Sequence, residues 1–245
     1  MLFSILGSTN SWKEALGLIL LTVPCILIAL IVHEVGHGLM ALWCGDKTAK
    51  DLGRLTLNPV SHLDPLGTIL MLLVGIGWTK PVPVNSRNFK HPRLDFVLTA
   101  LAGPIANLLT ALLAILGFCA IKRYDPNYIG LVLENFNGVA AYALQMLAVL
   151  NIGLALFNLI PLPPLDGSNV IMALLPEKAR NKYSMVRFYL PWIFLGLVAL
   201  RYLGRFFPTL AVLEDYIWMP LLKAESWVLD QLLAIGNWLF FTILG

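Results

Sequence analysis

Charged side chains are scarce in this sequence. Its 245 residues include 17 Lys and Arg and 14 Asp and Glu, so 13% are charged, whereas 58% are hydrophobic and the mean hydropathy is +0.78. A soluble domain has about 25% charged residues, so this composition excludes a soluble globular protein and indicates an integral membrane protein. The net charge of +3 is small, and the Lys and Arg residues lie in short loops. The sequence therefore gives no reason to expect nucleic-acid binding.

Cysteine is also rare, and the sequence contains no internal repeat, low-complexity tract or separate soluble domain. The three cysteines, Cys25, Cys44 and Cys119, have no paired spacing and lie in apolar stretches. An odd number of cysteines in this setting argues against a disulfide framework. We therefore expect a single membrane-embedded domain over residues 1–245 that is stabilised by packing.

Long apolar stretches dominate what is present. A membrane-spanning helix needs about 20 apolar residues. Five stretches reach or approach this length, namely 15–44, 96–121, 138–160, 188–202 and 226–244. The fourth is short unless 203–213 extends it, and Asp230 near the start of the fifth is also compatible with an interfacial helix. The sequence predicts an all-α polytopic membrane protein with five transmembrane helices.

A further segment, 65–78, is apolar but too short to cross a membrane. Gly75 and Gly77 lie near its end, and the alternation of Val82 and Val84 with prolines follows, a pattern that favours an extended or hairpin form. We predict a re-entrant, β-like segment near 65–85, with residues 75–84 offering an edge strand; a sixth transmembrane helix is the alternative.

The charges of the loops predict the orientation. Residues 80–93 carry four bases and no acid, and residues 177–187 carry four bases against one acid, so both loops should be cytosolic. The N-terminus then lies outside, and the first helix runs inward with positions 33–37 in its inner half. The third helix also runs inward and ends near Asp166, at the same depth.

Residues 33–37 read His-Glu-Val-Gly-His within the first apolar stretch. His33 and His37 are four residues apart on a helix, about 40° around its axis, so both imidazoles can reach one metal ion. Glu34 is turned about 100° from His33 and can act on a water nucleophile without binding the metal. Since Glu34 is the only charged residue between 15 and 45, and a carboxylate at membrane depth costs about 3 kcal/mol, we expect it to be functional.

A catalytic zinc ion has three protein ligands and one open position, so a third ligand is needed. The candidates are His62, Asp64, His91, Glu134 and Asp166. Asp166 is favoured because three prolines between 161 and 164 end the preceding helix, leaving the carboxylate on a rigid, non-helical corner where Gly167 permits a turn. Spacing alone also allows a simple Asp-Gly turn, and His62 and His91 are more typical of loop residues.

Together these motifs resemble the site-2 protease family, the intramembrane zinc metalloproteases. The resemblance is carried by HEVGHG at 33–38, AGPIAN at 102–107 and NLIPLPPLDG at 158–167, and LGRLTLNPVSHLDPLGT and KPVPVN are similar to the short bacterial branch. It implies that His33, His37 and Asp166 bind one Zn²⁺ per chain and that Glu34 is the catalytic base. Asn158 is implied to lie near the site, where it donates a hydrogen bond to the oxyanion or holds the substrate.

The resemblance covers about 15–175, the implied catalytic core, and leaves the C-terminal helices at 188–245 without a role. It implies transmembrane protein substrates, a bacterial cell membrane and no PDZ or CBS domain. For Gly103, Pro104 and Asn107 it implies packing rather than chemistry.

Three alternatives remain at this level. A membrane metal-ion transporter explains two histidines and an aspartate but gives Glu34 no role. A non-catalytic membrane scaffold does not need an intact zinc-protease motif. A membrane zinc protease with Glu as its third ligand lacks a suitable residue, since no Glu after the first helix lies within a firm span.

Overall fold

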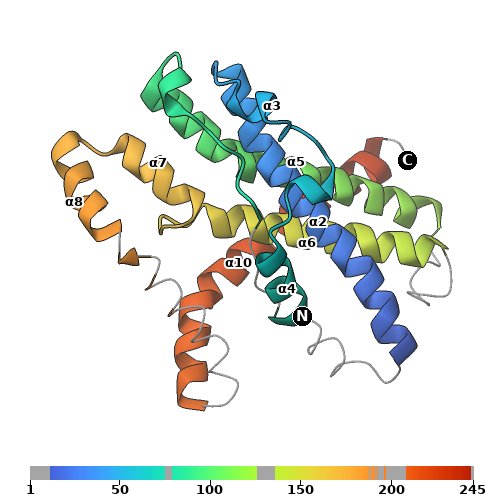
Figure 1. The fold of residues 1–245 in the computed structure, drawn as a ribbon. Helices are drawn as coiled ribbons and strands as arrows, with labels where there is room; N and C mark the ends of the chain where they lie inside the picture. The colour runs from blue at the N-terminus through green and yellow to red at the C-terminus, as the bar shows by residue number, and fades with distance from the viewer. Residues whose placement is uncertain are drawn as a thin grey trace.

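The computed structural model describes residues 12–74, 79–125, 136–187 and 208–243, together with positions 189, 190, 192 and 196. Within this part of the chain all regular structure is helical (Figure 1). The one β-type pairing found there is an isolated antiparallel bridge between Leu63 and Thr79. The predicted all-α class is confirmed for these residues.

Three helices are long and apolar enough to cross a membrane: α2 (Trp12–Trp43), α5 (Pro92–Tyr124) and α6 (Phe136–Asn158). They correspond to the first three predicted stretches. Helix α5 begins four residues before the predicted 96, because Pro92 occupies the first turn, where a missing backbone N–H costs nothing.

The C-terminal part differs from the prediction. Helix α10 (Pro208–Trp238) and a short π-helical turn, η4 (Leu239–Ile243), include most of the predicted stretch 226–244, but α10 starts 18 residues earlier and carries Lys223, Glu225 and Asp230. The predicted stretch 188–202 lies almost entirely outside the described residues. Within the described residues the structure supports three spans, and the predicted count of five or six is not confirmed.

The predicted β-like segment near 65–85 is wrong for its first half, since residues 65–74 form helix α4 (Pro65–Val74). Asp64 caps this helix, accepting a hydrogen bond from Gly67 N at 2.9 Å and, through its carbonyl, from Thr68 Oγ1 at 2.6 Å. A cap followed by a run of Leu and Met favours a helix over a strand. Gly75 and Gly77, which suggested a hairpin, lie outside the described residues.

Close packing between α2 and α5 forms the centre of the fold (Figure 1). A Cβ added at Gly36 would lie 2.8 Å from the carbonyl oxygen of Ala102 and 2.9 Å from Cβ of Ala106. Small residues on both helices thus let the two backbones approach closely, as is common between helices in membranes.

Helix α10 packs against α5 and α6. Its side chains Val228, Leu229, Leu232 and Leu233 cover a buried cluster from those helices that includes Ala111, Ile115, Phe118, Ala148 and Ile152. Trp218 of α10 also stacks on Phe157 near the end of α6, with ring centroids 6.3 Å apart. After α6 the chain passes through turns into α7 (Asp166–Leu174) and then α8 (Glu177–Arg187).

The loop between α2 and α5 contains the short helices α3 (Thr48–Asp51), η1 (Pro59–Ser61) and η2 (Ser86–Asn88) besides α4. Asp46, which is fully buried just after α2, ties this loop to the helix. Its carboxylate accepts hydrogen bonds from Asn85 N at 2.6 Å, Asn88 Nδ2 at 2.8 Å and Thr48 N at 3.1 Å. Burial by itself would raise the pKa of Asp46, but the Thr48 hydroxyl, which also donates to Oδ1, and these donors outweigh it and hold the pKa below its usual value.

Asp46→Asn tests this anchor, because the new amide places donors against donors. We expect a loss of about 1–3 kcal/mol in the free energy of unfolding at neutral pH. A carboxyl whose pKa is lower when folded stabilises the protein above about pH 4 and loses this contribution as the pH falls through the folded pKa. The gap between wild type and variant in detergent thermal unfolding should therefore narrow below about pH 4. Asp51→Asn, at an exposed site on α3, is the control, and a gap that does not change with pH would contradict the assignment.

Candidate metal centre

His33 and His37 of α2 meet Asp166, the first residue of α7, although 133 residues separate His33 from Asp166 in the sequence. Asp166 Oδ2 lies 3.0 Å from His33 Nε2 and 3.1 Å from His37 Nε2, and the two Nε2 atoms are 3.1 Å apart. The three side chains are 8%, 12% and 18% exposed. Among the described residues this is the one group of three or more His, Cys, Asp or Glu that could hold a metal ion.

The donor set fits a zinc ion. Ligand atoms at about 2.0–2.1 Å from a tetrahedral zinc lie about 3.3 Å from one another, close to the spacing found here. His37 Nδ1 lies 2.7 Å from the carbonyl oxygen of Thr99, which can only accept, so Nδ1 carries the proton and Nε2 presents a lone pair. A carboxylate and imidazole lone pairs that converge in a buried site form a donor set suited to a metal cation.

Helix α5 forms the floor of the site. Thr99, Gly103 and Asn107 are spaced four residues apart and so lie on one face. The Thr99 carbonyl receives the His37 hydrogen bond, and Asn107 Oδ1 lies 2.6 Å from His33 Nδ1. A Cβ added at Gly103 would collide with His37 Nε2 and would lie 2.8 Å from Cε1 of His33, so both rings pack directly on the helix backbone.

Glu34 accepts two hydrogen bonds from the loop after α4. Thr79 Oγ1 donates to Oε1 and Val82 N donates to Oε2, each at 2.9 Å. The loop is also held by Arg54, whose Nη2 donates to the carbonyl of Lys80 at 2.7 Å. The carboxylate is therefore fixed in direction.

These contacts bear on the predicted edge strand. Pro81 and Pro83 have no N–H, Lys80 N donates to His62 O at 2.8 Å, and Val82 N is bound to Glu34. A substrate peptide could therefore use the Val82 amide only by taking it from Glu34.

The setting of Asp166 differs from the predicted one. Helix α6 ends at Asn158, before the prolines, as expected, but the chain then folds through consecutive turns and Asp166 begins helix α7. Gly167 is helical and does not make the expected turn. A Cβ there would overlap the carbonyl oxygen of Leu159 and lie 2.6 Å from that of Ile160, so glycine is needed for close backbone contact.

The other candidate ligands lie elsewhere or have other partners. His62 is fully buried, with Nε2 2.8 Å from the carbonyl oxygen of Thr56. Asp64 caps α4, and His91 occupies the N-cap position of α5. Glu134 lies outside the described residues. Asn158 Nδ2 donates to Leu154 O at 3.0 Å, within its own helix, so its role in catalysis stays a prediction.

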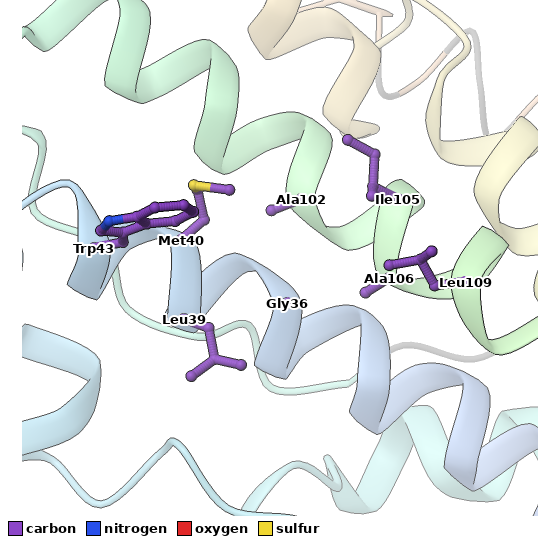
Figure 2. Close-up of a pocket in the computed structure, with 8 residues that line it drawn as sticks. All are labelled: Gly36, Leu39, Met40, Trp43, Ala102, Ile105, Ala106 and Leu109. Atoms are coloured by element: carbon purple, nitrogen blue, oxygen red, sulfur yellow. The ribbon is translucent and has the colours of Figure 1, made fainter.

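A separate apolar groove lies between α2 and α5, with a volume of about 210 Å³ (Figure 2). Figure 2 shows Met40 and Trp43 on the side of α2 that faces α5, whose Ile105 and Leu109 also line the groove. On α2 these residues lie well over 90° around the axis from Glu34, since each residue turns the helix by about 100°. The groove is therefore not the cleft in which Glu34 could act on a peptide.

Comparison with known proteins now adds to this geometry. A model of peptidase family M50 matches residues 21–200, most of the chain and all of the residues that form the centre. The chain belongs to peptidase family M50. It is thus a zinc-dependent peptide hydrolase of the site-2 protease family, and the group formed by His33, His37 and Asp166 is able to hold the metal ion.

Individual relatives agree. The chain is 38% identical over 225 residues to a Bacillus subtilis protein named "Putative zinc metalloprotease YwhC", covering 90% of this chain and 94% of the relative. It is 29% identical over 189 residues to "Putative zinc metalloprotease Rip2" of Mycolicibacterium smegmatis, covering 75% of this chain and 67% of the relative. The Rip2 protein of Mycobacterium tuberculosis H37Rv is 29% identical over 215 residues, or 85% of this chain and 78% of the relative. No solved structure matches the chain.

Two residues near the centre were not identified from the sequence. Thr79 gave no signal, because nothing in its local pattern indicates that it meets Glu34. Asn107 lies in the AGPIAN motif and was assigned to packing, yet it contacts His33 directly. The position of Asn107 offered a signal, since an Asn within the charge-free apolar stretch 96–121 needs a polar partner.

Gly103→Ala should disrupt the centre without replacing any of its three side chains. The added methyl would push both imidazoles from positions fixed by their Nδ1 contacts, and we expect zinc affinity to fall at least about 10-fold. Competition with a chelator, followed by elemental analysis of purified protein, measures this affinity. Gly117→Ala on the same helix is the matched control, since its Cβ would lie 3.2 Å from the flexible end of Leu144. Wild-type affinity in Gly103→Ala would contradict the described packing.

Proposed function

We propose that this protein is an intramembrane endopeptidase that hydrolyses peptide bonds within or near the transmembrane segments of other membrane proteins. The observation that carries the proposal is the position of the centre, because His33, Glu34 and His37 lie in α2, a helix able to span a membrane. Water-soluble peptides have little reason to enter such a site, whereas segments within the bilayer can approach from the side.

In this proposal His33, His37 and Asp166 hold one zinc ion. A zinc ion held there would supply Lewis acidity toward a water molecule and the scissile carbonyl. Glu34 accepts the proton of the attacking water and passes it to the leaving amine. Thr79 Oγ1 and Val82 N hold the Glu34 carboxylate in place, so that its remaining lone pairs can receive that proton. Asn158 is proposed to steady the oxyanion or the substrate backbone, which requires its amide to leave Leu154 O.

The substrate chemistry follows from the setting. Carbonyl groups of a transmembrane helix are already hydrogen-bonded, so the peptide must unwind locally before it is attacked. The bases of the α2–α5 loop and of α8 support a cytosolic position for the end of α2 that carries the centre. A membrane-tethered regulator cut in regulated intramembrane proteolysis, or a signal-peptide remnant, is the substrate class that we propose.

Zinc content tests the ligand set. Wild-type protein purified in detergent should contain about one zinc per chain, the stoichiometry of a site with three protein ligands, and Asp166→Ala should lose most of it. Elemental analysis before and after reconstitution with Zn²⁺ gives the answer. Full retention by Asp166→Ala would mean that another residue is the third ligand, and His62 would be examined next. An absence of zinc from both proteins would reject the metal centre.

Glu34→Gln separates catalysis from metal binding. This variant should keep its zinc, because Glu34 is not a ligand, and should cleave about 10²–10⁴-fold more slowly, the range of general acid–base contributions. The assay uses mass spectrometry of products from a single-span substrate that the wild type cleaves in reconstituted vesicles. Glu177→Gln, at an exposed site on α8, is the control. Cleavage by Glu34→Gln at the wild-type rate would show that Glu34 is not the base.

A further inference from the structure

Two asparagine side chains are fully buried where the three spanning helices meet. Asn107 of α5 and Asn151 of α6 are each 0% exposed. An amide buried at membrane depth is costly unless its donors and acceptors are satisfied, so two in contact with each other indicate a specific arrangement.

The hydrogen bonds of Asn107 determine which way its amide points. Nδ2 donates to the carbonyl oxygen of Ala29 at 2.9 Å and to Asn151 Oδ1 at 2.7 Å. A backbone carbonyl can only accept, so the atom that faces Ala29 must be the NH₂ group. The oxygen of Asn107 therefore faces His33, whose Nδ1 lies 2.6 Å away.

Asn151 is oriented by the same logic. Its Nδ2 donates to the carbonyl oxygen of Leu147 at 2.7 Å, one turn earlier in α6, which leaves its oxygen free to accept from Asn107. Two backbone carbonyls, those of Ala29 and Leu147, thus fix the direction of both amides, and neither can reverse without placing an oxygen against an oxygen.

The consequence reaches the metal centre. Because Asn107 Oδ1 can only accept, His33 must carry its proton on Nδ1, which leaves the lone pair of Nε2 facing Asp166 and His37. For His37 the Thr99 carbonyl has the same effect. Metal-bound histidines commonly depend on such a partner at the other ring nitrogen.

We propose that Asn107 and Asn151 are positioning residues that hold His33 in the ring orientation and tautomer needed to bind zinc, and that Asn151 makes this support depend on α6. The inference rests on the proposed ligand role of His33. If the two asparagines served packing alone, the hydrogen bond between their amides would be expected, but the 2.6 Å contact between Asn107 Oδ1 and His33 Nδ1 would not be required.

The test compares two replacements of Asn107 in the full chain in detergent. Asn107→Leu removes the acceptor, and we expect zinc affinity, measured against a chelator, to fall about 10–100-fold. Asn107→Asp keeps an oxygen that accepts from His33 Nδ1 but places its other oxygen against Ala29 O and Asn151 Oδ1, so its zinc affinity should fall clearly less than that of Asn107→Leu. The visible absorption of the Co²⁺-substituted protein gives a second readout, because it reports the geometry of the ligands and should change in Asn107→Leu.

Thr110→Val is the matched control. It deletes a hydrogen bond to Ala106 O one turn further along α5, away from His33, and should leave both readouts unchanged. Wild-type zinc affinity in Asn107→Leu would overturn the proposal, as would equal losses in Asn107→Leu and Asn107→Asp. If Asn107→Leu does not fold, Asn151→Leu replaces it, and an unchanged affinity and Co²⁺ spectrum in that variant would overturn the proposal as well. A wild-type protein that binds no zinc would instead reject the metal centre itself.

Discussion

The convergence of three electron-rich atoms in a buried site is the constraint around which this protein is organised. Asp166 Oδ2 and the Nε2 atoms of His33 and His37 lie 3.0–3.1 Å apart, and a metal cation among them would offset the cost of burying these polar groups. Each histidine also needs a hydrogen-bond partner at Nδ1, because otherwise its ring can rotate and the Nε2 lone pair no longer faces the other two side chains. Much of the surrounding structure supplies that second layer of contacts.

Helix α5 meets most of this demand. Its small residues let α2 approach closely, and the same face presents the Thr99 carbonyl, bare backbone at Gly103 and the amide of Asn107 beneath the two rings. A larger side chain at position 103 would separate the rings from the helix. The same face of α5 therefore allows the two spans to pack closely and orients the two histidines. This explains why an apolar helix carries Gly and Asn at these positions.

Glu34 is held by a different part of the molecule. The loop that donates to its carboxylate lies after α4 and is fixed by Arg54 and, through Asn85, by Asp46 beyond the end of α2. Glu34 lies in α2, and Asp46, which holds the loop through Asn85, comes directly after α2. The two histidines and Glu34 thus share one helix, but their supports come from separate elements: α5 and α6 for His33, and the loop for Glu34.

The sequence alone indicated the membrane class, the first three of the predicted spanning helices, and His33, Glu34 and His37, because apolar length and the His-Glu-x-x-His spacing are local properties. Asp166 was only one of five candidates for the third ligand, and the tertiary structure brings it to the two histidines. It did not determine the helix at 65–74, where Gly75 and Gly77 suggested a hairpin but the capped Leu-Met run decided the structure. Nor did it reveal the roles of Thr79, Asn107 and Asn151, whose partners lie 45, 74 and 44 residues away. Local patterns report propensity and periodicity, whereas the direction of a buried amide or the support of a catalytic carboxylate exists only once distant segments are in contact.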